Sequence, residues 1–234
     1  MHQIPLQPRF AQDLRVHLAR PGGAAGPRRR GVVGRRLTVD DDDIIEIAGV
    51  KVTSPARTWL DLATLLDPLD LIIAGDYLVS CHRRSFGPWT TPKVSLEELR
   101  AYVASRARVR GLPLARRSVD RLRVGVDSPP ETVLRLMLED AGLPRFDVDC
   151  PVIGPGGIAV LWPDLSNEKY RVAIEYDGAH HLTPGQQFRD IQRDALTAEL
   201  GWAQIKINRL DLRQGQWWVA SKVERVLERR GWRR

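Results

Sequence analysis

Apolar residues in the second half of the chain follow either the alternation of a strand or the period of a helix. A helix is expected to begin at Ser128-Pro129-Pro130-Glu131, where serine can cap and glutamate lies three residues on, and to stop at Gly142. The later patterns predict three strands, a helix, a strand and a closing helix at residues 146–153, 158–165, 170–176, 184–200, 205–207 and 216–230. The sequence therefore predicts an α+β fold in the order α-β-β-β-α-β-α.

The first half of the chain predicts a smaller, mainly helical domain. A hairpin is expected around Ala48-Gly49, and three helices are expected after Ser54, over residues 69–80 and after Ser95. The consecutive acids Asp40 to Asp43 are interpreted as a solvated turn. The expected division is an Arg/Gly/Pro-rich, partly disordered segment, a small α/β domain, a basic helical linker and the α+β domain, over residues 1–36, 37–98, 99–125 and 126–234.

Length and composition exclude several classes of protein. With 234 residues there is room for one large domain or two small ones. No apolar run reaches the roughly 18 residues of a membrane span, and no signal-peptide pattern opens the chain. Cys81 and Cys150 have no metal-ligand spacing, and no P-loop or dinucleotide fingerprint is present. The expectation is a reduced cytoplasmic protein with no membrane contact and no nucleotide cofactor; its oligomeric state is left open.

Positive charge is concentrated in the first half of the chain. Residues 1–127 hold 21 Lys+Arg and 14 Asp+Glu, whereas residues 128–234 hold 15 of each. Residues 100–123 alone contain eight arginines and one acid. Because guanidinium matches phosphate geometry, DNA, most simply a duplex, is the expected partner, with a solvated helical linker as the alternative. The candidate nucleic-acid contacts in this segment are Arg106, Arg108, Arg110, Arg116 and Arg117.

Carboxylates gather near one predicted strand. Glu175 and Asp177 lie two residues apart, so both leave the sheet on the same side, and Asp164 lies one hairpin away. Oxygen ligands that converge in this way suit Mg²⁺ or Mn²⁺. The alternative is a strand end with solvated acids and a turn at Asp177-Gly178.

A set of spaced motifs resembles the actinobacterial branch of very-short-patch-repair-like (Vsr-like) endonuclease domains, within the PD-(D/E)XK nucleases. The resemblance covers roughly residues 125–212 and rests on Ser128-Pro-Pro-Glu131, Arg135, Gly142-Leu-Pro144, Asp164-Leu165, Glu175-Tyr-Asp-Gly-Ala-His-His181, Arg189-Asp190, Arg193-Asp194 and Gly201-Trp202. It implies a restriction-endonuclease-like core, a mixed sheet flanked by helices, and a metal-dependent DNA endonuclease acting in repair or defence.

The resemblance also implies roles for individual residues. Asp164 and Glu175 stand at metal-binding positions, Asp177 stands where the wider superfamily has a lysine, and His181 resembles the histidine that Vsr-type enzymes use in its place. Glu131 matches a helix carboxylate that joins the site in many members. The expected catalytic set is Asp164, Glu175, Asp177, His181 and Glu131, of which Asp164, Glu175 and Asp177 would bind the metal.

Alternatives remain open at several of these positions. Asp177 could orient His181 or bind metal, and His180 is a less favoured choice than His181. Glu131 could be only the capping partner of Ser128. A run of arginines and aspartates in the helix after the strand, which includes Arg193, is expected to form ion pairs along one helix face, with phosphate contact by Arg193 as the alternative.

A second resemblance lies in the first half of the chain. The run from Ile47 to Ala63 resembles the region that follows the winged helix in AbiEi-type antitoxin and regulator proteins, which bind operator DNA. Within it, Arg57 and Asp61 are spaced to pair with each other. Three hypotheses follow: an endonuclease, a non-catalytic DNA-binding regulator of antitoxin type that uses a relic nuclease fold, and a protein-interaction module whose acids are structural.

Overall fold

The computed structural model describes residues 2–13, 15–20, 26–36, 38–82, 91–178 and 184–234. The chain forms two compact units, the first from Met1–Val79 with Pro92–Leu122 and the second from Ser80–Thr91 with Arg123–Arg234. Within the described residues, no helix is both long enough and apolar enough to cross a membrane.

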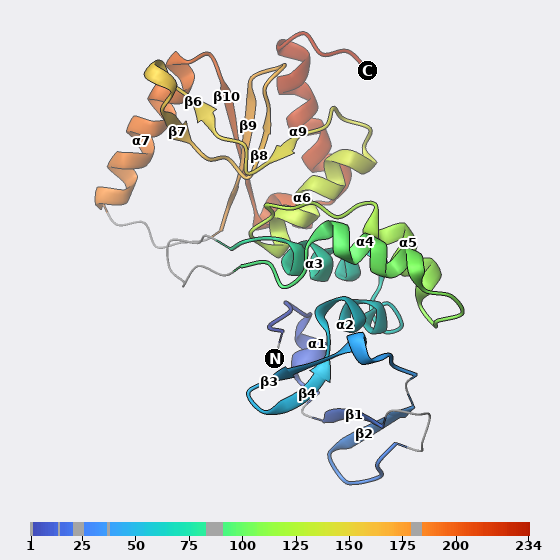
Figure 1. Ribbon diagram of the computed structural model, residues 1–234. Coiled ribbons are helices and arrows are strands. Elements are labelled where there is room, and N and C mark those ends of the chain that lie inside the picture. Colours follow the sequence, from blue (N-terminus) through green and yellow to red (C-terminus); the bar gives the residue numbers. More distant parts are fainter. Residues whose placement is uncertain (1, 14, 21–25, 37, 83–90, 179–183) are drawn as a thin grey trace. The chain divides into compact units, whose positions relative to one another are not determined.

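The first unit combines small two-stranded sheets with a group of helices (Figure 1). Its elements are α1 (Pro8–Ala11), β1 (Val16–Arg20), β2 (Val32–Arg36), the 3-10 turn η2 (Asp41–Asp43), β3 (Ile44–Ile47), β4 (Val50–Thr53), α2 (Pro55–Leu62), α3 (Pro68–Val79), α4 (Leu96–Ser105) and α5 (Leu112–Val119). Strands β1 and β2 pair in parallel, and β3 and β4 form an antiparallel hairpin. The hairpin turns at Ala48 and Gly49, both with positive φ, as expected from the sequence.

Helices α2 to α5 enclose the core of this unit. Trp59, Leu71 and Leu99 are fully buried, and the Trp59 indole donates a hydrogen bond to the Leu71 carbonyl at 2.8 Å. The expected helix starts at Ser54 and Ser95 are confirmed, since each serine accepts a backbone N–H from the first turn of α2 or α4. Residues 99–122 do not form a linker: they belong to this unit as most of α4 and as α5, which packs against α3 and α4.

The second unit is an α+β arrangement built on a mixed sheet. Its elements are α6 (Pro129–Asp140), β5 (Asp147–Val148), β6 (Val152–Ile153), the turn η3 (Pro155–Gly157), β7 (Ala159–Leu161), β8 (Leu165–Asn167), β9 (Val172–Asp177), α7 (Pro184–Glu199), β10 (Ala203–Asn208), α8 (Arg209–Arg213) and α9 (Gln216–Arg229). The sheet has the strand order β10-β9-β8-β5. Strand β10 runs parallel to β9, whereas β8 is antiparallel to both β9 and β5.

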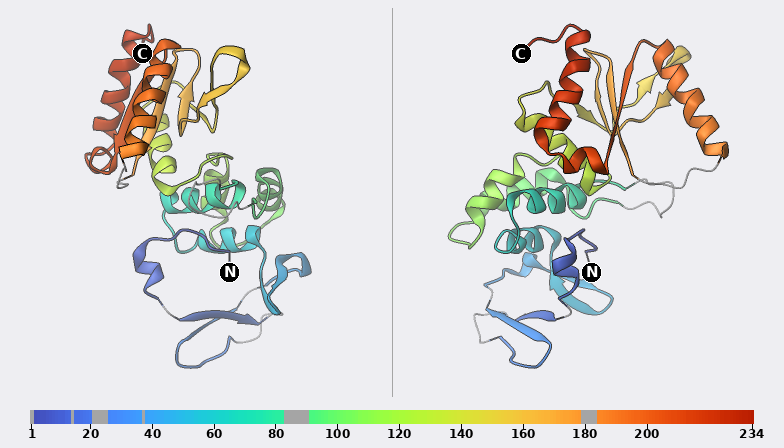
Figure 2. Two further views of the ribbon diagram at one scale, coloured as in Figure 1. Left: turned by 90° about the vertical axis from the view of Figure 1, so that its left-hand side faces the viewer. Right: turned by 180° about the vertical axis from the view of Figure 1, so that it is seen from behind.

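Helices cover both faces of this sheet, with α6 and α9 on one side and α7 with the β6–β7 hairpin on the other (Figures 1 and 2). Ile174 and Ile205 point to the α6–α9 side and belong to its large apolar cluster. Ala173 points to the other side, where it packs in a smaller cluster with Val152 and Leu161. Alternation along each strand therefore assigns odd positions of β9 and even positions of β10 to the face covered by α7.

The predicted three-strand meander is more broken than expected. Residues 158–165 were expected to form one strand, but they divide into β7, which pairs with β6, and the start of β8, which belongs to the main sheet. The break falls at Trp162-Pro163, where proline lacks the N–H that a continuous strand would need. The expected helices at 184–200 and 216–230 and the strand at 205–207 are confirmed as α7, α9 and β10.

Candidate functional site

The candidate site lies on the sheet face that α7 covers. Glu175 and Asp177 occupy alternate positions of β9, on the side opposite Val172 and Ile174, which are buried against α6 and α9. The two carboxylates therefore leave the sheet on one side, as the sequence pattern predicts. Glu175 is half-buried at this face, whereas Asp177, at the end of the strand, is exposed.

Asp164 is held against the same strand. It immediately precedes β8, where Leu165 pairs with Ile174, so the antiparallel register places Asp164 opposite Glu175. Its Oδ2 accepts a hydrogen bond from the backbone N–H of Tyr176 at 2.5 Å. Because Tyr176 follows Glu175 directly, this bond fixes the Asp164 carboxylate against the β9 backbone next to Glu175.

Two basic side chains accompany Glu175. Lys206 is its register partner on the parallel strand β10, and Arg193 on α7 brings Nη2 to 3.6 Å from Glu175 Oε2. The Glu175 side chain is only 18% exposed. Burial raises its pKa, and the charges of Arg193 and Lys206 offset part of that rise.

Lys206 is anchored by a second carboxylate. Its Nζ donates a hydrogen bond to Asp194 Oδ2 at 2.7 Å, which connects β10 to α7. This bond is the main cause of a raised Lys206 pKa, so the group remains an ammonium ion at neutral pH. Lys206 therefore supplies fixed positive charge and cannot serve as a proton acceptor there.

The pairs Glu175–Arg193 and Asp194–Lys206 form a compact set of four alternating charges, which we call the β9–β10 charge cluster. Arg193 and Asp194 were expected to form ion pairs along their own helix. Both reach across to the sheet, because α7 packs over β10. The side chains of Arg189 and Asp190, their expected partners along the helix, lie outside the described residues. The helix spacing alone gave no indication of these partners.

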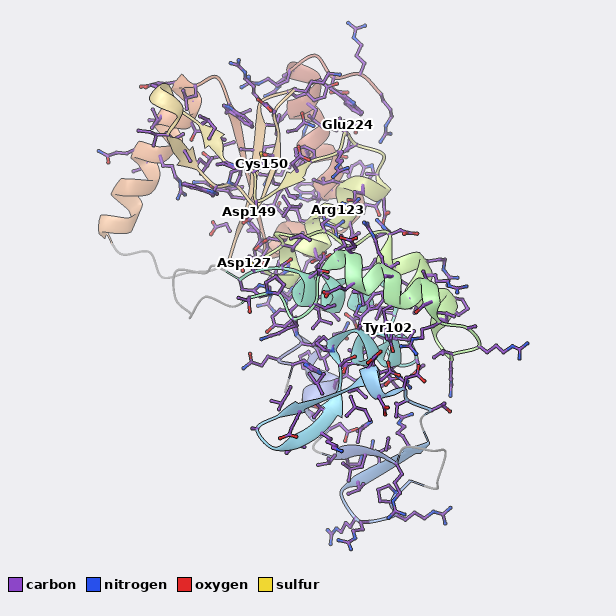
Figure 3. All side chains as sticks on the ribbon, viewed as in Figure 1. Tyr102, Arg123, Asp127, Asp149, Cys150 and Glu224 are labelled. Atoms are coloured by element: carbon purple, nitrogen blue, oxygen red, sulfur yellow. The ribbon has the colours of Figure 1, made fainter. Side chains whose placement is uncertain are left out.

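Glu131 has a local structural role. Its Oε1 accepts the Ser128 hydroxyl at 2.6 Å and its Oε2 accepts the Asp127 backbone N–H at 2.8 Å. Both oxygens thus bind groups just before α6. This is not the expected capping box, because the Ser128 side chain makes no capping hydrogen bond to the helix. Asp127, labelled in Figure 3, also lies 3.1 Å from Nδ1 of His82.

The expected histidines His180 and His181 lie outside the described residues. Across the residues that the structure describes, no three His, Cys, Asp or Glu side chains come together as a metal-binding group. Cys81 and Cys150 are free thiols.

The arginines expected to contact nucleic acid differ in their surroundings. Arg106 lies 4.2 Å from the ring centre of Tyr102, which is labelled in Figure 3. Its guanidinium also pairs with the carboxylates of Asp40 and Asp43 within the first unit. By contrast, the other four predicted contacts are exposed to solvent: Arg108, Arg110, Arg116 and Arg117. Arg116 also donates a hydrogen bond to the Arg106 carbonyl.

The turn at residues 40–43 was expected to be solvated, but this is wrong for Asp43, which is fully buried. Its carboxylate accepts Tyr102 Oη at 2.6 Å and Arg57 Nη1 at 2.9 Å. The predicted Arg57–Asp61 pair is confirmed at 3.1 Å. Burial opposes ionisation of Asp43, yet these donors outweigh it and lower its pKa, while burial and Asp43 together raise the pKa of Tyr102.

Sequence reasoning missed Lys206 and Asp194 as members of the site. The available signal was the alternation Gln204, Lys206, Asn208 along β10, which places polar side chains on one face of a strand with buried Ile205 and Ile207. What the sequence could not supply was the parallel register that sets Lys206 against Glu175.

Comparison with known proteins gives two relatives from Mycobacterium tuberculosis. The chain is 26% identical over 219 residues to the uncharacterized protein MT2308 of strain CDC 1551 / Oshkosh and to the uncharacterized protein Rv2248 of strain ATCC 25618 / H37Rv. Each match covers 92% of this chain and 74% of the relative. No protein family in the comparison matches the chain, and neither does any solved structure.

Proposed function

We propose that the chain is a metal-dependent DNA endonuclease that hydrolyses phosphodiester bonds, with its site on the α7 face of the sheet. The observation that supports this most is that Glu175 on β9 lies beside Lys206 and Arg193, while Asp164, just before β8, is hydrogen-bonded to the next residue of β9. Carboxylates next to fixed positive charges provide separate places for a cation and for a phosphate.

The donor set fits Mg²⁺ or Mn²⁺. Magnesium keeps several waters and is usually held by one or two carboxylates together with substrate phosphates, so a dedicated cage of many protein ligands is not required. Asp164 and Glu175 would hold the ion, with Asp177 as a further ligand from the strand end. When bound, such an ion supplies a more acidic water and charge stabilisation on the phosphate.

The chain's own residues have distinct roles in this proposal. Lys206 remains protonated because Asp194 raises its pKa, so it would stabilise negative charge on a phosphate oxygen. Arg193 would exchange its contact with Glu175 for one with the phosphate, since guanidinium and phosphate form strong charge-assisted hydrogen bonds. His181 remains the expected proton acceptor on the basis of the resemblance alone.

Affinity for DNA would come mainly from the first half of the chain. The whole formal excess of +7 lies in residues 1–127, and four of the predicted arginine contacts are exposed there. Phosphate contacts of this kind bind any sequence and weaken steeply with salt. In this proposal, residues 1–127 supply most of the DNA affinity and the second unit supplies the catalytic groups.

Cleavage of supercoiled, mismatched and single-stranded DNA with Mg²⁺ or Mn²⁺ tests this function. Asp164→Ala and Glu175→Ala should each abolish nicking by the wild-type protein. Glu168→Ala is the matched control, because Glu168 is an exposed acid in the turn between β8 and β9. Equal activity in all variants, or cleavage that persists in EDTA, would contradict the proposed site.

A DNA-binding regulator without catalytic activity is the second candidate function. It is favoured by the ion pair that already neutralises Glu175 and by an aspartate, Asp177, at the position where the wider superfamily has a lysine. It predicts salt-dependent DNA binding that survives Glu175→Ala, with no cleavage of any substrate.

A further inference from the structure

The surface formed by α8 and the first turn of α9 exposes large apolar groups that the fold does not use. Trp217, in the first turn of α9, is 78% exposed, and Leu210, in α8, is 66% exposed. Isolated exposed leucines are common, but a tryptophan with most of its ring in water is a typical sign of a binding surface.

The neighbouring Trp218, by contrast, has a hydrogen-bond partner for its indole N–H within the fold. Its indole N–H donates to Asp211 Oδ1 at 2.9 Å, and Lys222 donates to the other oxygen of the same carboxylate at 3.0 Å. Asp211 is itself buried at the start of α8. These bonds join α8 to α9 and leave Trp217 on the outside of that junction.

The charge of this surface indicates the kind of partner. Asp211 is the only acid in residues 200–223, and it is committed to Trp218 and Lys222. Arg209 and Arg213 are exposed, and in the part of the chain that the structure describes neither has an ion-pair partner. Exposed guanidinium groups at the two ends of α8, a few residues before an exposed indole, suit a phosphate backbone with a flat base beside it.

The surface also adjoins the candidate site. Asn208, the last residue of β10, pairs with Asp177 of β9, and it caps α8 by accepting the N–H groups of Leu210 and Asp211. Adjacent strands lie about 5 Å apart. The α8–α9 surface therefore begins at the C-terminal ends of β9 and β10, where Asp177 lies.

We propose that this surface binds an unpaired segment of nucleic acid, with a base stacked on Trp217 and the adjoining phosphates held by Arg209 and Arg213. The inference rests on the proposed function, because the bound strand would continue into the proposed nuclease site. It gives that function a substrate class: DNA with unpaired nucleotides next to the cleaved bond. Inside a duplex both faces of every base are already stacked, so Trp217 contributes to single-strand binding and not to binding along a duplex.

Binding in EDTA tests the surface without any cleavage. The probes are a fluorescein-labelled strand of thymidines and a blunt duplex of the same length, followed by fluorescence anisotropy. Trp217→Ala should weaken single-strand binding by at least about fivefold, because base–aromatic stacking is lost, while duplex binding is unchanged. Trp217→Phe, which keeps a ring, should retain most of the affinity and shows that the loss does not come from misfolding.

Trp162→Ala is the matched control, since Trp162 is another exposed tryptophan of the second unit, at 57%, but lies between β7 and β8. Arg213→Ala should lower the slope of log affinity against log salt by about 0.7 for the single strand. Equal effects of Trp217→Ala and Trp162→Ala, equal losses for single strand and duplex, or a wild-type protein that binds no single strand would each overturn the inference.

Two further outcomes identify a different partner and so also overturn it. Loss of binding to anionic lipid vesicles in Trp217→Ala would assign the surface to a membrane, and loss of self-association in sedimentation would assign it to a second copy of the chain. Trp217-dependent strand binding without cleavage would retain the inference and reject the nuclease. If Trp217→Ala cleaves every substrate and binds the single strand as the wild type does, the nuclease is retained and the inference is rejected.

Discussion

Replacing Asp43 by alanine should strongly destabilise the first unit. The change removes the acceptor for Tyr102 Oη and for one nitrogen of each of Arg57 and Arg106. The Arg57 guanidinium is 6% exposed, so it cannot recover this loss by hydration. Breaking a buried ion pair costs about 3–5 kcal/mol. Since Arg57 keeps Asp61 and the Thr38 carbonyl, we expect the lower end, about 3 kcal/mol.

Urea unfolding followed by circular dichroism measures this loss. Asp41→Ala is the control, because Asp41 is exposed in the same turn and should change the free energy of unfolding by less than about 0.5 kcal/mol. Tyr102→Phe should cost about 1–2 kcal/mol, and the double variant should cost less than the sum because the two groups share one bond. Strict additivity, or equal stability of the Asp43 and Asp41 variants, would refute the reasoning.

The pH dependence of stability gives a second readout for Asp43. Its pKa in the folded protein is lowered below that of the unfolded chain, despite burial, by hydrogen bonds from Tyr102 and Arg57. Its contribution is therefore present above the unfolded value of about 3.9 and is lost as the pH falls through the folded pKa. The Asp43→Ala variant should lose this part of the acid sensitivity.

Three other changes have expected outcomes. Glu175→Gln should raise the melting temperature at pH 7, because burial raises the Glu175 pKa. Stability that is present below the unfolded pKa of about 4.3 is lost as the pH rises through the folded pKa, and glutamine avoids this loss. The gain should vanish in melts at pH 4. Lys206→Ala should lower the cleavage rate without moving the pH profile near neutrality, and Lys206→Arg should restore part of it, as measured by initial nicking rates. Gly75→Ala should destabilise the first unit by about 1–3 kcal/mol in urea, since the added methyl would lie 2.5 Å from Leu122 and 2.9 Å from the Trp59 indole nitrogen.

Local signals were sufficient wherever an element is determined by its own residues. The capping pair Ser95 and Glu98 forms both of its expected hydrogen bonds, so the start of α4 could be read directly from the sequence. The same is true of the hairpin at Ala48-Gly49, where two residues adopt positive φ. In such cases the free energy that selects the conformation comes from within a few residues.

Asp43 shows where this approach fails. Beside three other aspartates it has the pattern of a solvated turn, yet its partners Tyr102 and Arg106 lie 59 and 63 positions further along the chain. Nothing in the local pattern distinguishes the one acid that these groups select from its neighbours. Burial of a charge is decided by partners that the fold brings together, and only the tertiary structure supplies them.

The candidate site was predictable in part for the same reason. The alternation of Glu175 and Asp177 is a property of one strand, and the structure places both on the face opposite the large apolar cluster. The position of Lys206 depends on a crossover through α7 and on the register of a parallel pair. The sequence therefore indicated the negative side of the site and, on its positive side, Arg193 but not Lys206.

The β9–β10 charge cluster suggests why a cation and a phosphate would need to be present together. Each carboxylate of the cluster already has a basic partner, Glu175 with Arg193 and Asp194 with Lys206. A cation alone would compete with Arg193, and a phosphate alone would compete with the carboxylates for the same basic groups. With both present every charge keeps an opposite neighbour, so each should raise the affinity for the other by the same factor, as linkage requires. An assay that offers the metal without DNA, or DNA without the metal, would therefore underestimate binding at this site.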